Sequence, residues 1–165
     1  MHRILKKGGL AVLIVLIYFF GIRELRQEVH DLYMGTVLPD EYGQINDDYS
    51  FYSQSSVSFT IIPNSTSSQI SWQFRIPFDS YWLFGTFVLI LIGASKKEYI
   101  VLSTIHLVSG ISNTILVAIG IFGYDIFLIL TDFNCRYLIP LASLGYVAVI
   151  VGTKKSKSSS HVHTS

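Results

Sequence analysis

The chain has 165 residues, of which half are apolar and 14% are charged, whereas a soluble domain of this size usually carries about 25% charged residues. Much of its surface must therefore face something other than water. Four membrane crossings of about 20 residues each would use about half of the chain, which excludes a large soluble catalytic domain. The net charge of +1 carries little information, but the lysines and arginines form short clusters beside apolar runs and no basic groove for nucleic acid.

The first apolar run, residues 8–22, follows a basic start. It ends in Arg23-Glu24-Leu25-Arg26, without the small-residue cleavage pattern of a secretory signal. We therefore predict a cytoplasmic start and an uncleaved transmembrane helix within residues 1–22. Apolar residues then continue at helical spacing, which predicts that the helix extends beyond the membrane as an amphipathic stalk; they are Ile22, Leu25, Val29, Leu32 and Tyr33.

Residues 23–77 form the polar part, predicted to hold the stalk, a loop over 40–55 and a β-hairpin outside the cytoplasm. Apolar and polar residues alternate over 57–61 and again over 70–76, on either side of a turn-rich stretch. An isolated hairpin is marginal in water, so its apolar face should rest on the stalk, the membrane surface or a partner. Phe59, Trp72 and Phe74 are the candidate partner-facing residues.

Three further apolar segments, 78–95, 99–122 and 126–152, are predicted transmembrane helices, and 153–165 a disordered cytoplasmic tail. Residues 131–134 could instead form an outer loop. The predicted fold is a mainly α membrane protein, a four-helix transmembrane bundle with a small extracytoplasmic β-hairpin between the first two helices. Because basic clusters favour the cytoplasm, both termini should lie there; the clusters are Arg3, Lys6 and Lys7, Lys96 and Lys97, and Lys154, Lys155 and Lys157.

Polar side chains inside membrane segments are costly and often functional. Asn113, Asp132, Cys135 and Arg136 form the candidate intramembrane cluster. Asp132 and Arg136 are four residues apart, which suits an ion pair, and a rise of about 1.5 Å per residue puts Asn113 and Arg136 at one depth. The ion pair would pin its helix in the bundle or recognise a ligand or partner. The same rise separates His106 from Cys135 by more than about 10 Å, so we expect a core histidine and no Cys–His pair.

The sequence shows no phosphate-binding glycine loop, no metal-ligand pair at helical spacing and no nucleophile elbow. It contains a single cysteine, Cys135, so an internal disulfide is excluded. We therefore assign no catalytic residues, metal or cofactor, and expect a protein that is not an enzyme.

One stretch resembles a known group of proteins. Ile76-Pro77-Phe78-Asp79-Ser80-Tyr81-Trp82-Leu83-Phe84-Gly85, Ala94-Ser95-Lys96-Lys97-Glu98-Tyr99 and Ile105-His106-Leu107 are similar to small membrane proteins associated with bacterial exosortases. The resemblance covers about residues 76–140. It implies a bacterial inner-membrane protein that accompanies the sorting enzyme, because Cys135 directly before Arg136 does not match the enzymes' own motifs.

The leading hypothesis is a non-enzymatic accessory subunit of a membrane-bound export or processing system of the exosortase type. Its expected partners are an integral membrane protein and the lipid bilayer, with homo-oligomers also considered and nucleic acid not. One alternative is a sortase-like membrane cysteine transpeptidase using Cys135 and Arg136. Another is a small oligomeric channel lined by Asn113, Asp132 and Arg136.

Overall fold

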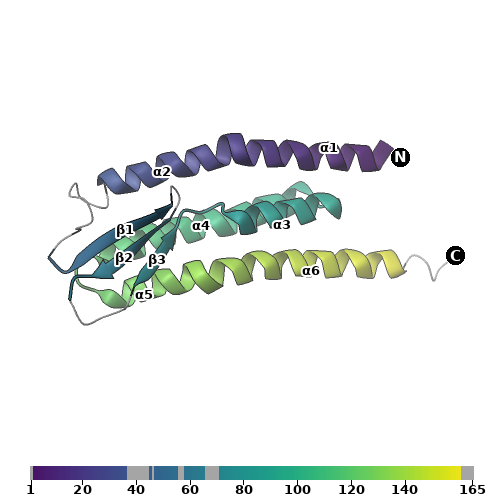
Figure 1. Cartoon of the computed structure of the whole chain (residues 1–165). Helices are drawn as coiled ribbons and strands as arrows, with labels where there is room; N and C mark the ends of the chain where they lie inside the picture. Colours follow the sequence, from purple (N-terminus) through teal and green to yellow (C-terminus); the bar gives the residue numbers. More distant parts are fainter. Residues whose placement is uncertain (1, 37–44, 46, 56–57, 66–70, 161–165) are drawn as a thin grey trace.

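The computed structural model describes residues 2–36, 45, 47–55, 58–65 and 71–160. These residues form four continuous helices and a three-stranded sheet (Figure 1). The first helix consists of α1 (His2–Ile17), a π-helical turn η1 (Tyr18–Ile22) and α2 (Arg23–Thr36). The second and third are α3 (Ser80–Leu91) and α4 (Lys96–Gly120). The last consists of α5 (Asp125–Phe133), a π-helical turn η2 (Asn134–Leu138) and α6 (Ile139–Ser160).

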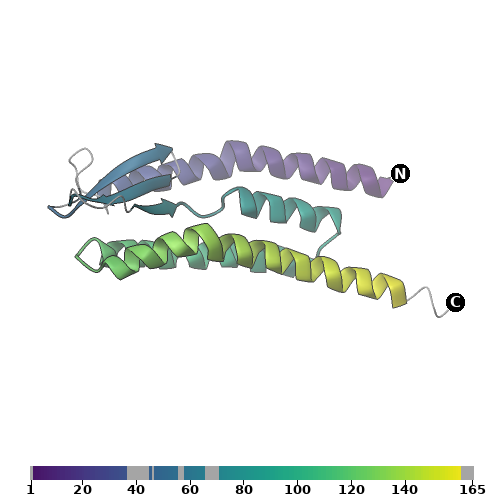
Figure 2. The same ribbon diagram turned by 60° about the horizontal axis from the view of Figure 1, so that its bottom comes forward.

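The helices lie side by side along one long axis, as Figures 1 and 2 show from two directions. The sheet lies at one end of this bundle, next to α2 and α5, and both ends of the chain lie at the other. The first helix continues past the apolar run to Thr36, as its helical spacing predicts; its place beyond the membrane stays a prediction.

The sheet is an antiparallel meander of β1 (Tyr49–Ser55), β2 (Ser58–Pro63) and β3 (Trp72–Arg75). Phe59 pairs with Phe74 and Ile61 with Trp72, which confirms the predicted hairpin; residues 57 and 70 of that prediction lie outside the described part of the chain. The prediction of a loop over 40–55 was wrong for β1. Its many serines weaken the alternation, and the strand is stabilised by pairing along β2 and by burial of Tyr49.

The apolar face of the sheet packs against the bundle. Its aromatic and aliphatic side chains share one core with Val117 and Ile121 of α4 and Leu128 of α5, and Val29 of the stalk packs at the edge. A second core, in the half of the bundle away from the sheet, joins α3, α4 and α6 through Leu89, Leu102 and Val147. The two cores leave a band between them, where the polar side chains described below lie.

Several helix boundaries differ from the predicted ones. The second helix was predicted over 78–95 but has only 12 residues, because Asp79 caps its start and Gly93, at φ +65°, follows its end. The last helix continues through 131–134 and on to Ser160. The helix predicted over 126–152 therefore includes 131–134, and the alternative of an outer loop there was wrong. The prediction of a disordered tail was wrong for residues 153–160, which continue the helix; residues 161–165 lie outside the described part of the chain.

The predicted basic clusters meet at the end of the bundle opposite the sheet. Lys7 Nζ donates to the Leu91 carbonyl at 2.6 Å, and Lys154 Nζ donates to the Gly93 carbonyl at 2.5 Å. Both lysines thus cap the last turn of α3, whose free carbonyls carry partial negative charge. The clusters therefore share one face of the molecule.

Three helices are long and apolar enough to cross a membrane: Leu5–Leu32, Lys96–Gly120 and Asp125–Lys155. The fourth, α3, is apolar but shorter. Large apolar side chains are exposed along all of them, including Phe20, Phe84, Ile111 and Leu141. Such surfaces are unfavourable in water and suit a lipid environment.

Candidate functional site

Three polar side chains from three helices meet in the band between the two cores. His106 Nε2 lies 2.9 Å from Ser143 Oγ, joining α4 to α6. On its other side, His106 Nδ1 lies 4.0 Å from Asp79 Oδ1 at the start of α3. His106 and Ser143 are 0% exposed and Asp79 9%. We call Asp79, His106 and Ser143 the central polar cluster.

The link between β3 and α3 positions this cluster. Phe78 adopts φ +60°, a conformation that side-chain-bearing residues rarely take and that often marks functional sites. Its ring stacks on His106, with centroids 5.9 Å apart. The next residue, Asp79, accepts a hydrogen bond from the Tyr81 amide at 3.0 Å and so forms the N-cap of α3.

Arg26 of the first helix reaches the same region. Its guanidinium donates to the Tyr18 hydroxyl at 3.3 Å and to the Ile76 carbonyl at 3.0 Å. Asp79 is close enough to interact with it electrostatically, which reduces the cost of burying two charges. Arg26 is 8% exposed, and its Nε–H has no hydrogen-bond partner among the described residues.

The order Asp–His–Ser matches that of a hydrolytic triad, but the surroundings do not match nucleophilic catalysis. Ser143 is fully buried in the middle of the continuous helix formed by α5, η2 and α6, where backbone amides are used by the helix and cannot form an oxyanion hole. His106 Nδ1 also lacks a hydrogen bond within the described part. The arrangement is suited to joining three helices through polar contacts.

The predicted intramembrane cluster divides into two groups. Asn113 donates from Nδ2 to Cys135 Sγ at 3.2 Å and accepts from Asn134 at 2.5 Å. Asn113 and Cys135 are buried, and Asn134 is half-buried. Arg136 instead pairs with Asp132 at 2.8 Å, as its spacing predicted. The partners of Asn113 are therefore Asn134 and Cys135. The equal depth of Asn113 and Arg136 suggested a different partner, Arg136.

The Asp132–Arg136 pair connects the last helix to the sheet. Asp132 Oδ1 also accepts the Gln73 amide of β3 at 2.6 Å. Arg136 remains 44% exposed, so it holds the carboxylate from the outside. This geometry favours the structural interpretation, in which the pair pins helix and sheet together.

The first and last helices each contain a π-helical turn beside polar side chains. Such turns are frequent at functional sites. The turn η1 starts at Tyr18, which contacts Arg26. The turn η2 holds Asn134, Cys135 and Arg136 and is closed by the Ile139 amide bonding to the Asn134 carbonyl. Pro140 explains η2, because a proline cannot donate to the carbonyl four residues earlier and its ring crowds that group.

The predicted partner-facing residues lie inside the chain. Phe59, Trp72 and Phe74 are 0%, 6% and 1% exposed, and Phe59 stacks on Phe74 at 4.7 Å. They were interpreted as partner-facing because a two-stranded hairpin would leave one face bare. Val117 and Ile121 at the end of α4 and Leu128 of α5 pack on that face instead.

Sequence reasoning missed Arg26 and Ser143 as site residues and named Asp79 only within the stretch that carries the family resemblance. For Arg26 a signal exists, since it lies within the apolar helical stripe of Ile22, Leu25 and Val29. For Ser143 no signal distinguishes a packing serine from one that contacts histidine. Within the described residues, no group of histidine, cysteine, aspartate or glutamate is arranged to hold a metal ion.

Comparisons of the chain with protein-family models, with curated proteins and with solved structures found no match.

Proposed function

We propose that this chain is an integral membrane protein with four crossings and with both termini in the cytoplasm. Three long apolar helices support the crossings. The shared basic end supports the orientation, since Lys7 and Lys154 both lie against the end of α3 and basic clusters favour the cytoplasmic side. The sheet then lies at the outer surface.

The short α3 is consistent with a crossing when the non-helical link before it, residues 76–79, is included in its length. Its 12 residues span about 18 Å, less than the roughly 30 Å of the hydrocarbon core. The non-helical link completes the crossing, which is tolerated only where protein covers the backbone. Arg26 satisfies the Ile76 carbonyl, and Pro77 lies close against Gly110.

In this membrane we propose that the chain acts as a non-enzymatic accessory subunit of an export or processing system of the exosortase type. The observation that carries this role is the bare surface of the first helix. Only 11% of its most apolar window is buried within the chain, and Leu13 and Phe20 are 51% and 78% exposed. That surface is available to helices of a partner protein.

The resemblance to exosortase-associated proteins supports the same role. The residues that carry it come together in space, because Phe78, Asp79 and His106 are in mutual contact. The alternative of a cysteine transpeptidase has less support, because Cys135 is paired with Asn113 while His106 is paired with Ser143.

The test is photocrosslinking in the native membrane followed by mass spectrometry. A photoreactive residue at Phe20 should give a stoichiometric adduct with a membrane protease, sortase or exporter. The control is Val149, an apolar position on α6 that is 62% exposed. Adducts only between copies of this chain would support an oligomeric channel, and no adduct at Phe20 would contradict the accessory role.

A further inference from the structure

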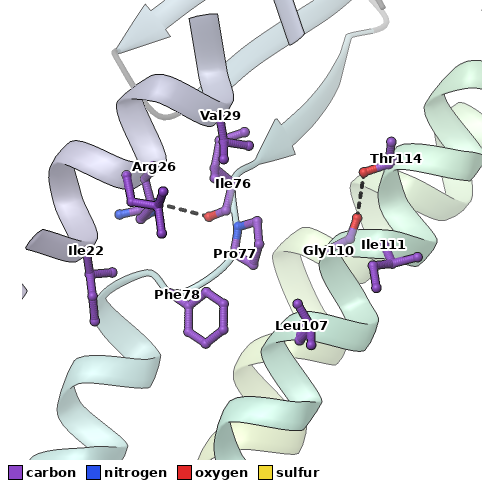
Figure 3. A pocket seen from close by; sticks show the side chains of 11 residues that line it. Ile22, Arg26, Val29, Ile76, Pro77, Phe78, Leu107, Gly110, Ile111 and Thr114 are labelled. Atoms are coloured by element: carbon purple, nitrogen blue, oxygen red, sulfur yellow. Dashed lines mark hydrogen bonds between the residues drawn. The ribbon is translucent and has the colours of Figure 1, made fainter. Parts of the chain in front are cut away.

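Two hollows of the structure share one residue, Arg26. The first is an apolar groove of about 300 Å³ between α2, the link and α4. Figure 3 shows its walls, with Arg26 on one side and Leu107 and Ile111 on the other. It is lined by Ile22, Leu25, Arg26, Val29, Ile76, Pro77, Phe78, Leu107, Gly110, Ile111 and Thr114.

The second hollow is a polar pocket, also of about 300 Å³, lined by Tyr18, Arg26, Ser58, Arg75, Asp79 and Ser80. Two arginines and one aspartate give it a formal charge of +1. Asp79 already accepts the Tyr81 amide, and Arg75 donates to Gln73 at 3.3 Å. Arg26 keeps one buried N–H without a partner in the described residues. An anionic group held by the two guanidinium groups would balance this charge.

The dimensions of the groove favour a slender apolar chain. A cavity of about 150 Å³ holds a benzene molecule, so this groove has about twice that room. Two turns of a helix about 10 Å wide would need on the order of 850 Å³. A partner helix therefore does not fit inside it, whereas part of an acyl chain does.

The depth of the groove agrees with a lipid. Counting about 1.5 Å per residue from Lys7, Ile22 lies about 22 Å and Arg26 about 28 Å from the basic end. The hydrocarbon core is about 30 Å thick. Arg26 thus lies near the outer head-group level, and the groove extends from there toward the membrane centre along Leu107.

We propose that the groove and the pocket together bind one anionic glycerophospholipid of the outer leaflet. One acyl chain occupies the groove, and the phosphate is held by Arg26 and Arg75. This inference rests on the membrane placement proposed above and is independent of the accessory role.

The experiment is native mass spectrometry of the full chain released from vesicles of equal parts phosphatidylglycerol and phosphatidylcholine. The wild-type chain should retain one phosphatidylglycerol, with at least about a tenfold preference, equivalent to about 1.4 kcal/mol. Arg26→Gln should remove that preference. Ile111→Trp, which fills the groove from an exposed position on α4, should lower retention by about tenfold without changing charge.

Two control variants match these changes. Arg23→Gln removes an exposed charge from the same helix, and Ile115→Trp enlarges a side chain that is 53% exposed one turn beyond Ile111. Both should retain lipid as the wild type does. Three results would overturn the proposal. The wild-type chain could retain both lipids equally, the variants and the controls could lose lipid equally, or the bound molecule could prove to be a free fatty acid. Alkaline carbonate extraction tests membrane placement separately, so a chain that resists extraction but retains no lipid contradicts the lipid site alone.

Discussion

At the scale of single residues, several polar side chains in the bundle interior have a specific neighbour. His106 contacts Ser143, Asn113 contacts Cys135, and Arg26 contacts the Ile76 carbonyl. Burying such groups without partners costs several times more than the contact itself returns. The contacts therefore select one arrangement of the helices more than they stabilise it.

The His106–Ser143 contact gives the first prediction. Ser143→Ala and His106→Leu should each destabilise the bundle, and their double variant should lose less than the sum, because both remove the same hydrogen bond. Such coupling in membrane proteins averages about 0.6 kcal/mol and reaches about 1.7 kcal/mol. The coupling energy would be measured by adding a denaturing detergent to each variant in mild detergent and following its unfolding. Additive effects would show that the two side chains do not interact, and Ser112→Ala serves as a control outside the cluster.

At the scale of elements, alternation predicted the two strands of the hairpin, and helical spacing predicted that the first helix continues beyond residue 22. They did not predict β1, because its alternation is short and polar residues follow it over 53–55. They also overestimated α3, since the apolar run continues to Ala94 while the helix ends before Gly93. Hydrophobicity gives the extent of an apolar segment, whereas caps and positive φ angles give the ends of the helix.

The turn between α4 and α5 depends on the absence of a side chain at Gly120. A Cβ there would lie 2.5 Å from Leu128 Cδ2 and 3.2 Å from the Leu128 amide. Gly120→Ala should therefore push α5 away from α4 and cost about 1–3 kcal/mol. At Gly145, where a Cβ would meet nothing within 4 Å, the same substitution should be neutral or slightly stabilising. Thermal unfolding of the two variants would compare them, and equal effects would contradict the described packing.

The contact between the sheet and α5 should depend on pH. Tyr49 donates to the Asp125 carboxylate, and burial followed by this hydrogen bond raises the pKa of Tyr49 to about 12. An unfolded tyrosine has a pKa of about 10. The folded chain holds this proton more tightly, so the contribution to stability is complete below about pH 10 and is lost as the pH rises to about 12.

The ring of Trp72 lies 6.2 Å from that of Tyr49 and reports on this contact. In a Trp82→Phe background, Trp72 fluorescence should change with a midpoint near pH 12. Tyr49→Phe should abolish this transition and reduce the loss of thermal stability between pH 9 and 11. A Trp72 transition that persists in Tyr49→Phe would assign it to another group.

At the scale of the whole molecule, depth counting predicted part of the candidate site. It set His106 apart from Cys135, and these two residues have different hydrogen-bond partners. It could not predict the central polar cluster, because Asp79 reaches His106 only through the non-helical link at Phe78, and straight helices contain no such link. Nor could it show that Arg26 turns inward, since the face that a stalk residue presents depends on the sheet packed beside it.

The orientation of the molecule gives the last prediction. The native Cys135 is 1% exposed and should not react with a membrane-impermeant maleimide, so the wild-type chain provides a background without label. Asp47→Cys lies on the sheet side and Lys97→Cys at the basic end, both at exposed positions. In intact cells Asp47→Cys should be labelled and Lys97→Cys only after the membrane is opened, because the basic end faces the cytoplasm. The reverse pattern would invert the topology and move the lipid site to the inner leaflet, while labelling of both positions in intact cells would contradict insertion across the membrane.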